Sequence, residues 1–397
     1  MRTIITIFKK ELIDTLRDRR TLIAMVLIPL LLFPLLIGIS SKIVISQAKK
    51  AREKVLRVAI VRYDNADLFK EMLAKRDGVR IVENIPVDSV RSFIQKDSLD
   101  GAFVFSKNFD RQVANLQAGR IKVYYKSTED DDITKNRLLD LVKEFEKQLI
   151  SHRFKELNLD ENIAKTIKLI EVNIATAREK IGKAIGGFIP YLFIIFCFTG
   201  SMYPAIDLGA GEKERGTIET LLTSPVNRLQ ILLGKFGVVV LTGITSAIIS
   251  MVGLYVGIRQ VEEIPKELFD ALLGILEIHS IILVLSLLLP LTIFFAGFQL
   301  SISIYTRSFK EAQSIISPMM IAVIVPAFLG LIPGITLNTT TALIPVLNVS
   351  LATKEILSGT IKPVLLAEVY ISLIVLAGIS LFLCSKWFER EETIFRV

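Results

Sequence analysis

Few residues in this sequence have the types and spacing that catalysis requires. Glu391 and Glu392 are followed by Arg396, and such a carboxylate could activate water for hydrolysis if buried histidines lay beside it. The chain has two histidines. His152 lies in a polar segment and His279 at the start of an apolar run, where the topology below places it across the membrane from Glu392. A membrane protease is therefore an unfavoured alternative.

The sequence contains no complete motif for nucleotide or metal binding either. A P-loop needs Gly-x-x-x-x-Gly-Lys-[Ser/Thr], and neither Gly182-Lys183-Ala184 nor Gly234-Lys235-Phe236 meets it. The acidic run at 129–132 lacks the alternating ligands and the glycine of a calcium loop. Cys197 and Cys384 lie singly in apolar runs, where a thiol behaves as a small hydrophobe. We expect no metal and no cofactor on this chain.

Another group of polar side chains lies inside or beside uncharged runs. Ionisable groups at membrane depth are costly, so they are candidates for function. The ionisable ones fall near predicted outer ends of spans, and a boundary role in water or headgroups is the alternative. If the chain conducts a cation, the expected path-lining groups are Glu277, His279, Glu368, Thr242, Thr245 and Thr292.

Long uncharged runs dominate the sequence and predict a membrane protein. Hydrophobic residues make up 51% of the 397 residues, and the mean hydropathy is +0.53. About 20 apolar helical residues cross a bilayer. Runs of this length are 21–41, 184–206, 236–258, 280–306, 312–332 and 364–385. The net charge of +8 forms no basic stripe with interleaved aromatics, so the expected partner is the lipid bilayer and not nucleic acid.

Charge bias favours six spans with both termini in the cytoplasm. The four inner pieces (1–20, 206–236, 305–314, 385–397) hold 15 Lys and Arg, whereas the two short outer loops hold four. The uncharged run 312–353 leaves two alternatives open: two spans, or one span followed by a re-entrant hairpin after Pro333-Gly334. We adopt the hairpin, because a seventh span would place the basic C-terminal tail outside.

Residues 42–183 differ from the rest and predict an α/β domain outside the membrane. Alternating apolar residues indicate strands at 56–61, 79–82, 101–105 and 121–125, with helices at 66–75, 87–96 and 133–157. At the N-terminus, apolar residues recur every three or four positions over 1–20 and indicate an interfacial helix; the alternative is the frayed start of the first span. The predicted domains are 1–20, the first span 21–41, the α/β domain 42–183, spans two to six over 184–385, and the tail 386–397.

The most informative segment is the coupling loop, residues 207–235, between the second and third spans. Gly216 permits a turn, Thr217–Thr223 can form a short helix with apolar residues on one face, and Pro225 ends it. A short amphipathic helix held between two spans is suited to a groove on a soluble partner. The alternative is an ordinary charged loop that orients the spans.

The sequence resembles the permease subunits of type-two ABC exporters. The run Glu-Arg-Gly-Thr-Ile-Glu-x-Leu-Leu-x-Ser-Pro, from Glu214 to Pro225, is similar to their coupling-helix signature. The N-terminal run from Phe8 to Arg20, the segment 344–350 and the tail 388–392 are similar to the NatB subfamily of sodium-efflux permeases. The implied fold is a membrane all-α protein of six spans, with an interfacial helix, a re-entrant hairpin and an inserted extracytoplasmic α/β domain.

The resemblance also implies an assembly and a site. A homodimer of the permease binds two ATPase subunits, which carry ATP and Mg²⁺, in a prokaryotic cytoplasmic membrane. The residues implied in coupling are Glu212, Glu214, Arg215, Gly216, Thr217, Ile218, Glu219, Leu221, Leu222 and Pro225. In this scheme the charged members contact the ATPase, Leu221 and Leu222 fill its groove, and Pro225 sets the angle into the third span. The cargo implied is Na⁺; a drug, lipid or peptide exporter and a non-transporting membrane sensor are the alternatives.

Overall fold

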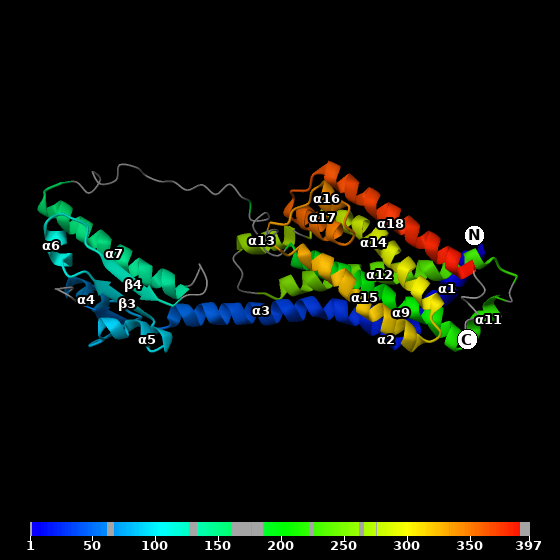
Figure 1. Ribbon diagram of the computed structural model, residues 1–397, viewed down its shortest axis with the longest axis horizontal. Helices are drawn as coiled ribbons and strands as arrows, with labels where there is room; N and C mark the ends of the chain where they lie inside the picture. Colours follow the sequence, from blue (N-terminus) through cyan, green and yellow to red (C-terminus); the bar gives the residue numbers. More distant parts are fainter. Residues whose placement is uncertain are drawn as a thin grey trace. The chain divides into compact units, whose positions relative to one another are not determined.

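The computed structural model describes residues 2–61, 67–126, 133–159, 176, 186–222, 225–261, 266–274, 276–332 and 334–389. The chain divides into two compact units. Unit 1 combines Met1–Ser40 with Asn173–Val397, and unit 2 is Ser41–Val172. Figure 1 shows the helices of unit 1 and the smaller α/β fold of unit 2.

Among the described residues, six helices are long and apolar enough to cross a membrane, which confirms the predicted number (Figure 1). The first candidate span, Arg19–Ile43, runs through α2 (Arg19–Leu22), the π-helix η1 (Ile23–Leu27) and the start of α3 (Ile28–Glu53). The others are Phe188–Glu214, which begins with α9 (Phe188–Ile206), then α12 (Arg228–Arg259), α14 (Ile278–Tyr305), α15 (Phe309–Leu329) and α18 (Pro363–Glu389).

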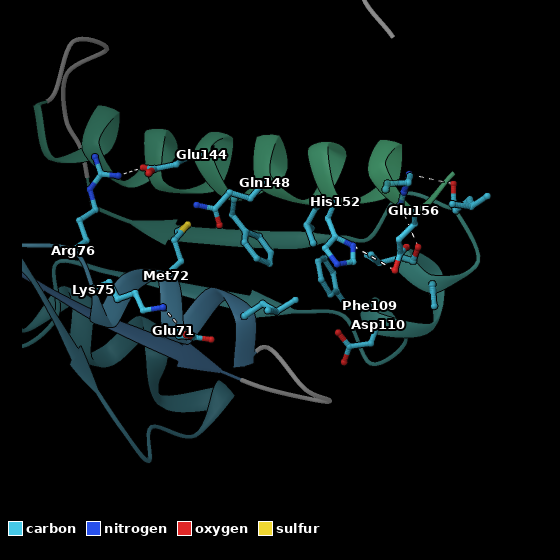
Figure 2. Close-up of a pocket in the computed structure, with 17 residues that line it drawn as sticks. Glu71, Met72, Lys75, Arg76, Phe109, Asp110, Glu144, Gln148, His152 and Glu156 are labelled. Carbon is cyan, nitrogen blue, oxygen red and sulfur yellow. Dashed lines mark hydrogen bonds and ion pairs between the residues drawn. The ribbon is translucent and has the colours of Figure 1, made fainter. Parts of the chain in front are cut away.

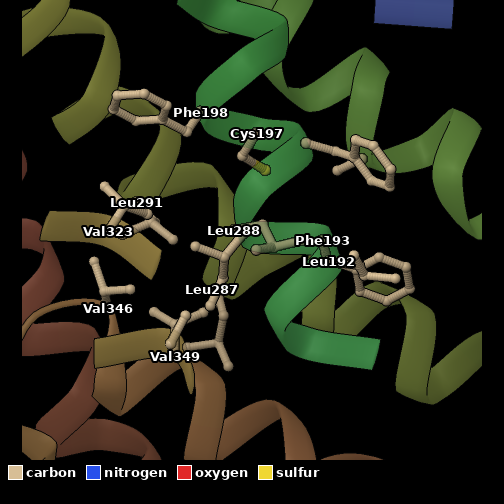
Figure 3. Packing of buried hydrophobic residues seen from close by; sticks show 14 of the residues in the cluster. Leu192, Phe193, Cys197, Phe198, Leu287, Leu288, Leu291, Val323, Val346 and Val349 are labelled. Carbon is tan, nitrogen blue, oxygen red and sulfur yellow. The ribbon is translucent and has the colours of Figure 1, made fainter. Parts of the chain in front are cut away.

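Helix α9 lies at the centre of unit 1. It is apolar on all sides, as expected of a helix that other helices surround. In the most apolar stretch of the span that it begins, 78% of the residues are buried, against 22% for the corresponding stretches of the first, fifth and sixth spans. Figure 3 shows Phe193, Cys197 and Phe198 of α9 packed near Leu288 and Leu291 of α14. Small residues allow close approach: a Cβ added to Gly200 would lie 2.0 Å from the Ser246 hydroxyl of α12.

Two short helices lie between α15 and α18, where the sequence left alternatives open. They are α16 (Thr339–Ala342) and α17 (Leu347–Ser358). The α17 helix has 12 residues, fewer than the roughly 20 that cross a bilayer. The turn between them is closed by the Asn348 amide, which donates to the Ala342 carbonyl at 3.0 Å. The described part of 312–353 therefore holds one candidate span and a short-helix pair.

The N-terminal segment is a separate helix, α1 (Arg2–Arg17). Asp18 ends it and caps α2, because its carboxylate accepts hydrogen bonds from the Thr21 amide at 3.1 Å and hydroxyl at 2.7 Å. The buried face of α1 consists of Ile7, Glu11 and Thr15.

Unit 2 is a four-stranded sheet covered by helices on both faces. Its strands β1 (Leu56–Val61), β2 (Val79–Val82), β3 (Gly101–Phe105) and β4 (Ile121–Tyr125) occupy the residues that alternation predicts. The order is β2-β1-β3-β4, with β1 parallel to β2 and β3, and β4 antiparallel to β3. All five residues of β3 are buried, as expected of a central strand.

The helices of unit 2 divide between the two faces of the sheet. The helices α4 (Asp67–Ala74), α6 (Phe109–Ala114) and α7 (Ile133–Glu156) bury Phe69, Phe109 and Phe145 against one face. On the other face, α5 (Val90–Gln95) buries Val90 and Ile94, and the 3-10 turn η2 (Val87–Ser89) precedes it. The α6 helix was not predicted from the sequence.

Candidate functional site

The coupling loop continues the second span without a break before it turns. Helix α9 passes into the π-helix η4 (Asp207–Gly211) and then α10 (Glu212–Glu214). Gly216 has φ +69°, and a Cβ placed there would meet nothing within 4 Å. Glycine is thus required by the left-handed backbone and not by crowding. The turn leads into α11 (Thr217–Leu222), which is labelled in Figure 1.

Side chains on both sides of this turn hold the loop to its own chain. The Arg215 guanidinium donates to Asp207 Oδ1 at 2.7 Å, and this hydrogen bond raises the pKa of Arg215 above its ordinary value. The Thr217 hydroxyl donates to the Glu212 carbonyl at 3.2 Å. Ile218 is buried. The start of α11 is therefore fixed to the end of the second span.

The loop is also joined to the ends of the fourth and fifth spans. Lys213 Nζ donates to the Ile304 carbonyl and, at 3.4 Å, to the Thr306 carbonyl, both at the end of α14. Glu214 Oε2 accepts from the backbone amide of Phe309 at 2.8 Å. That amide is one of the free donors at the start of α15, where a carboxylate also matches the helix dipole. A displacement of the loop would thus pull on α14 and α15.

A buried ionic cluster lies behind the loop and is defined by Glu11, Glu212 and Lys235. Their side chains are 2%, 6% and 1% exposed, and they come from α1, α10 and α12. Lys235 Nζ lies 3.5 Å from Glu11 Oε1, forms a closer ion pair with Glu212, and donates to the Leu208 carbonyl at 3.2 Å. Buried charges are stable only when paired, so Lys235 holds three elements together.

The outer side of this ionic cluster is closed by Lys10. Its Nζ lies 3.2 Å from Glu11 Oε1 and its side chain is 57% exposed. Burial alone would lower the pKa of Lys10, but Glu11 raises it above the ordinary value, so Lys10 stays charged. Glu212 Oε2 is buried and has no hydrogen-bond partner among the described residues. The cluster therefore contains more carboxylate than its single buried cation can satisfy.

Two glycines let α1 approach α12 closely enough to form this cluster. A Cβ on Gly234 would lie 2.8 Å from Ile7 Cγ2, and a Cβ on Gly237 would lie 3.1 Å from Phe8 Cδ2. Any larger side chain at Gly234 would push α1 away. Gly234 and Lys235, which lie at the end of the predicted coupling loop, thus place α1 beside that loop.

The structure distributes the predicted coupling residues unevenly. Glu214, Arg215, Gly216, Thr217 and Pro225 are exposed. Glu212 is buried against Lys235, so its carboxylate is not exposed for the expected contact with a partner subunit. The backbone of Glu219, Leu221 and Leu222 belongs to α11, whereas residues 223–224 lie outside the described residues.

Sequence reasoning missed Glu11 and Lys235 as members of a site. A signal was present for Glu11, because Ile7, Glu11 and Thr15 recur every four residues and share one helix face. Charged residues are rarely buried unless paired, so the position of Glu11 on this face did not by itself indicate a buried site.

The candidate path residues do not form one site through the contacts of the described residues. Glu277 and His279 are exposed at the start of α14. The hydroxyls of Thr242, Thr245 and Thr292 donate to carbonyls of their own helices at 2.7–2.9 Å. Glu368 is half-buried on α18, and its Oε2 has no hydrogen-bond partner in the described part of the chain.

Comparison with known proteins shows which family the chain is similar to. The family described as ABC-2 family transporter protein matches residues 19–385. The chain belongs to the ABC-2 transporter family. It is also 24% identical over 394 residues to the ABC transporter permease protein NatB of Bacillus subtilis (strain 168), a match that covers 98% of each chain.

Membership of the ABC-2 family explains several features together. The chain is a multi-pass membrane permease subunit of an ABC transporter, and such a permease works with an ATPase subunit. The match to NatB supports the subfamily resemblance inferred from the sequence.

Proposed function

We propose that this ABC-2 permease is the transmembrane subunit of an exporter, and that a separate ATPase drives it through the coupling loop. The observation that supports this most directly is the set of contacts around the loop. Lys213 and Glu214 bind the ends of α14 and α15, and Glu212 binds Lys235 of α12. A force applied to α11 would therefore reach spans two to five through charged contacts and not through a flexible linker.

The ATPase would bind the exposed side of the loop. Glu214, Arg215 and Thr217 offer charged and polar contacts there, and Leu221 and Leu222 would fill its groove. Glu212 has a different role in this proposal, since it holds the loop to α1 and α12. ATP and Mg²⁺ would bind the partner, and two copies of the permease would form the pathway between them.

The proposed orientation follows the distribution of basic residues. The coupling loop and both termini would face the cytoplasm of a prokaryotic cell, and 42–183 would lie outside. The α16–α17 pair would be the re-entrant hairpin at the outer mouth. Its irregular backbone is compatible with membrane depth because α17 is largely buried in protein.

The cargo we propose is Na⁺, on the basis of the subfamily resemblance. Oxygen atoms that could contact a cation are present inside unit 1. The Gln299 side chain is fully buried on α14; its amide nitrogen donates to the Phe198 carbonyl at 2.9 Å, and its Oε1 has no partner among the described residues. In other transporters Na⁺ is coordinated by oxygen atoms such as backbone carbonyls.

Flux measurements test the proposal. Inverted vesicles that contain the permease and its ATPase should accumulate ²²Na⁺ when ATP is added. The double change Leu221→Asp and Leu222→Asp should abolish both accumulation and cargo-linked ATP hydrolysis at an unchanged amount of permease. The matched control is Leu157→Asp with Leu159→Asp, two exposed leucines of unit 2.

Each alternative function has a distinct outcome in these vesicles. ATP-dependent movement of a drug, lipid or peptide, but not of Na⁺, would show that the protein is an exporter with a different cargo. A complete lack of transport with an active ATPase would favour the sensor. Substrate cleavage that is lost in Glu392→Gln would favour the protease. ATP-dependent transport that the two aspartates leave intact would refute the role of the coupling loop.

A further inference from the structure

Three arginines lie where α1 meets the first span. Arg17 ends α1, and Arg19 and Arg20 begin α2 after the break at Asp18. All three are exposed. In the part of the chain that the structure describes, none of their guanidinium groups forms a hydrogen bond or an ion pair. The first 20 residues hold six Lys and Arg in all, and a basic cluster of this size beside a membrane span is typical of a site for anionic lipid.

Exposed basic side chains of unit 2 show the usual alternative, an ion pair with a nearby acid. In Figure 2, dashed lines join Lys75 to Glu71 and Arg76 to Glu144. Such surface pairs add little to stability, but they neutralise the charge that would attract an anion. The three arginines beside the first span keep their charge available for another partner.

The acids closest in sequence to these arginines are already engaged. Glu11 lies in the buried ionic cluster, and Asp14 lies 3.7 Å from Lys10. Asp18 attracts Arg20 electrostatically, but its two carboxylate oxygens cap α2, since they accept hydrogen bonds from the first turn of that helix. The junction therefore carries more positive than negative charge and can attract an anionic group.

An exposed apolar stripe begins at the same arginines and follows the first span. The helix is continuous from Arg19 to Glu53 through α2, η1 and α3. Residues four apart share a helix face. At this spacing the exposed apolar residues are Ile23, Leu27, Leu31, Leu35 and Ile39, each 45–59% exposed. One step before Ile23 is Arg19, so the stripe ends in a basic group.

The stripe fits an acyl chain in length, and the arginines fit a phosphate headgroup. From Ile23 to Leu31 the helix rises about 12 Å, close to the roughly 15 Å of hydrocarbon in one leaflet. An arginine at the end of such a stripe can lay its apolar stem along the lipid and place its guanidinium at headgroup depth. A guanidinium binds two phosphate oxygens through parallel hydrogen bonds.

A second copy of the permease is the less favourable occupant of this face. In a twofold dimer the same patch occurs on both subunits. Contact through the stripe would bring the arginines of both copies together, where the acids of the junction are already engaged. Like charges placed opposite each other across an interface are costly. A partner that brings negative charge and an apolar chain satisfies both parts of the surface.

We infer that Arg17, Arg19 and Arg20 bind the phosphate of an anionic phospholipid, whose acyl chains lie along the exposed stripe from Ile23 to Leu31. The lipid belongs to the inner leaflet, and this assignment alone rests on the orientation proposed above. The site consists of residues at the end of α1 and in the first span. It therefore depends neither on the cargo nor on the ATPase.

Fluorescence quenching by brominated lipids tests this inference in the full-length permease. Trp387→Phe removes the single tryptophan of the chain, and Ile23→Trp then reports on the stripe. The vesicles contain equal amounts of phosphatidylglycerol and phosphatidylcholine, with bromine on the acyl chains of one or the other. We expect quenching at Ile23→Trp that corresponds to an at least about threefold preference for phosphatidylglycerol.

The matched reporter is Phe382→Trp on α18, in the same Trp387→Phe background. Position 382 is 65% exposed, and of the described charges that follow it in α18, Lys386 is balanced by Glu389. Both lipids should quench this reporter equally. Equal quenching at Ile23→Trp, or the same preference at both positions, would overturn the inference. A lack of quenching by either lipid at Ile23→Trp would also overturn it and would assign the stripe to a protein contact.

Charge variants assign the preference to the three arginines. Arg17→Gln, Arg19→Gln and Arg20→Gln together should remove it. Lysine substitutions at the same three positions should retain it, because they keep the charge that attracts phosphate and orients the span. The matched control changes three exposed basic residues of unit 2, Lys96→Gln, Arg111→Gln and Lys122→Gln, and should leave the preference unchanged. A preference that survives the glutamine changes at the three arginines would refute the site.

Additions to the Ile23→Trp protein test the chemistry without any charge substitution. The preference should fall in about 1 M NaCl, where charges more than about 3 Å apart are screened, and an unchanged preference would contradict recognition by charge. Soluble glycerol phosphate should not reduce the preference; if it does, the site takes a free phosphate and not a lipid. The bound ATPase should also leave it unchanged. A preference that disappears when the ATPase binds would assign the surface to that subunit and overturn the inference.

Discussion

Removing the ammonium of Lys235 should release α1 from the coupling loop. Lys235→Met keeps most of the side-chain volume and leaves Glu11 and Glu212 buried without the cation between them. Breaking a buried ion pair from one side costs about 3–5 kcal/mol, because the remaining charge stays desolvated. A free-energy change of about 1.4 kcal/mol corresponds to a tenfold change in an equilibrium constant. The equilibrium between α1 packed against α12 and α1 released from it would therefore shift by roughly a hundredfold to several thousandfold toward release.

The expected rescue depends on charge and not on shape. Adding Glu11→Gln and Glu212→Gln to Lys235→Met replaces the whole ionic cluster by neutral groups of similar size. Replacement of a complete buried ion pair by hydrophobic residues of similar volume is often close to energetically neutral, and a neutral amide costs far less to bury than an unpaired carboxylate. The triple variant should therefore recover more than half of the free energy that Lys235→Met loses.

Thiol labelling measures the release directly. Both native cysteines are buried, so they should react little with a hydrophilic maleimide. A cysteine introduced by Ile7→Cys on the buried face of α1 can therefore be followed with this reagent. Its labelling rate should rise with the released fraction in Lys235→Met and fall again in the triple variant. Asp14→Cys, on the exposed side of α1, should label equally in all backgrounds. An unchanged rate in Lys235→Met, or no recovery in the triple variant, would refute the reasoning.

Three further predictions concern the loop, the α1 contact and unit 2. Gly216→Val should uncouple ATP hydrolysis from transport, since a β-branched residue is strained at φ +69°, whereas Gly216→Asn should retain coupling in the same vesicle assay; equal loss in both would contradict the backbone argument. Gly234→Leu should increase maleimide labelling at Ile7→Cys, because a Cβ at position 234 would lie 3.0 Å from the Cβ at position 7 and 3.3 Å from the Ile4 carbonyl oxygen, both of which remain in that variant; unchanged labelling would contradict the close approach. Burial alone would raise the pKa of Asp100, but hydrogen bonds from Lys54 at 2.5 Å and the Arg57 amide at 2.8 Å bring it below the ordinary value. Its stabilisation is thus present above the ordinary pKa and is lost as pH falls through the lowered one, so Asp100→Asn should cost about 1.5–3 kcal/mol at neutral pH and less in acid, as measured by calorimetric unfolding; an equal cost at both pH values would contradict the pairing.

Local patterns were sufficient for much of this fold. The six spans could be predicted because about 20 consecutive apolar residues have few other stable environments. The strands of unit 2 could be predicted to the residue, because alternation marks which face each side chain takes. The run 312–353 could not be divided in this way. It is uncharged throughout, and the length of α17 depends on a turn at Val346, whose φ of 70° no propensity predicts.

The candidate site could be predicted only in part, for a different reason. The coupling loop stands out because its charged and apolar residues are adjacent in sequence. The ionic cluster depends on a pair, Glu11 and Lys235, that only the folded chain brings together. In the sequence alone, Glu11 and Glu212 each fit the pattern of a solvent-exposed acid, so the burial of Glu212 could not be predicted.

The position of α1 has a consequence for biosynthesis. The helix is translated before its buried partner on α12, because Lys235 is made only after the first two spans and all of unit 2. Until then Glu11 lacks the buried cation, and α1 cannot take its final position against α12. Closure of the Glu11–Lys235 contact is therefore a late step of assembly, one that a ribosome stalled before the third span could not reach.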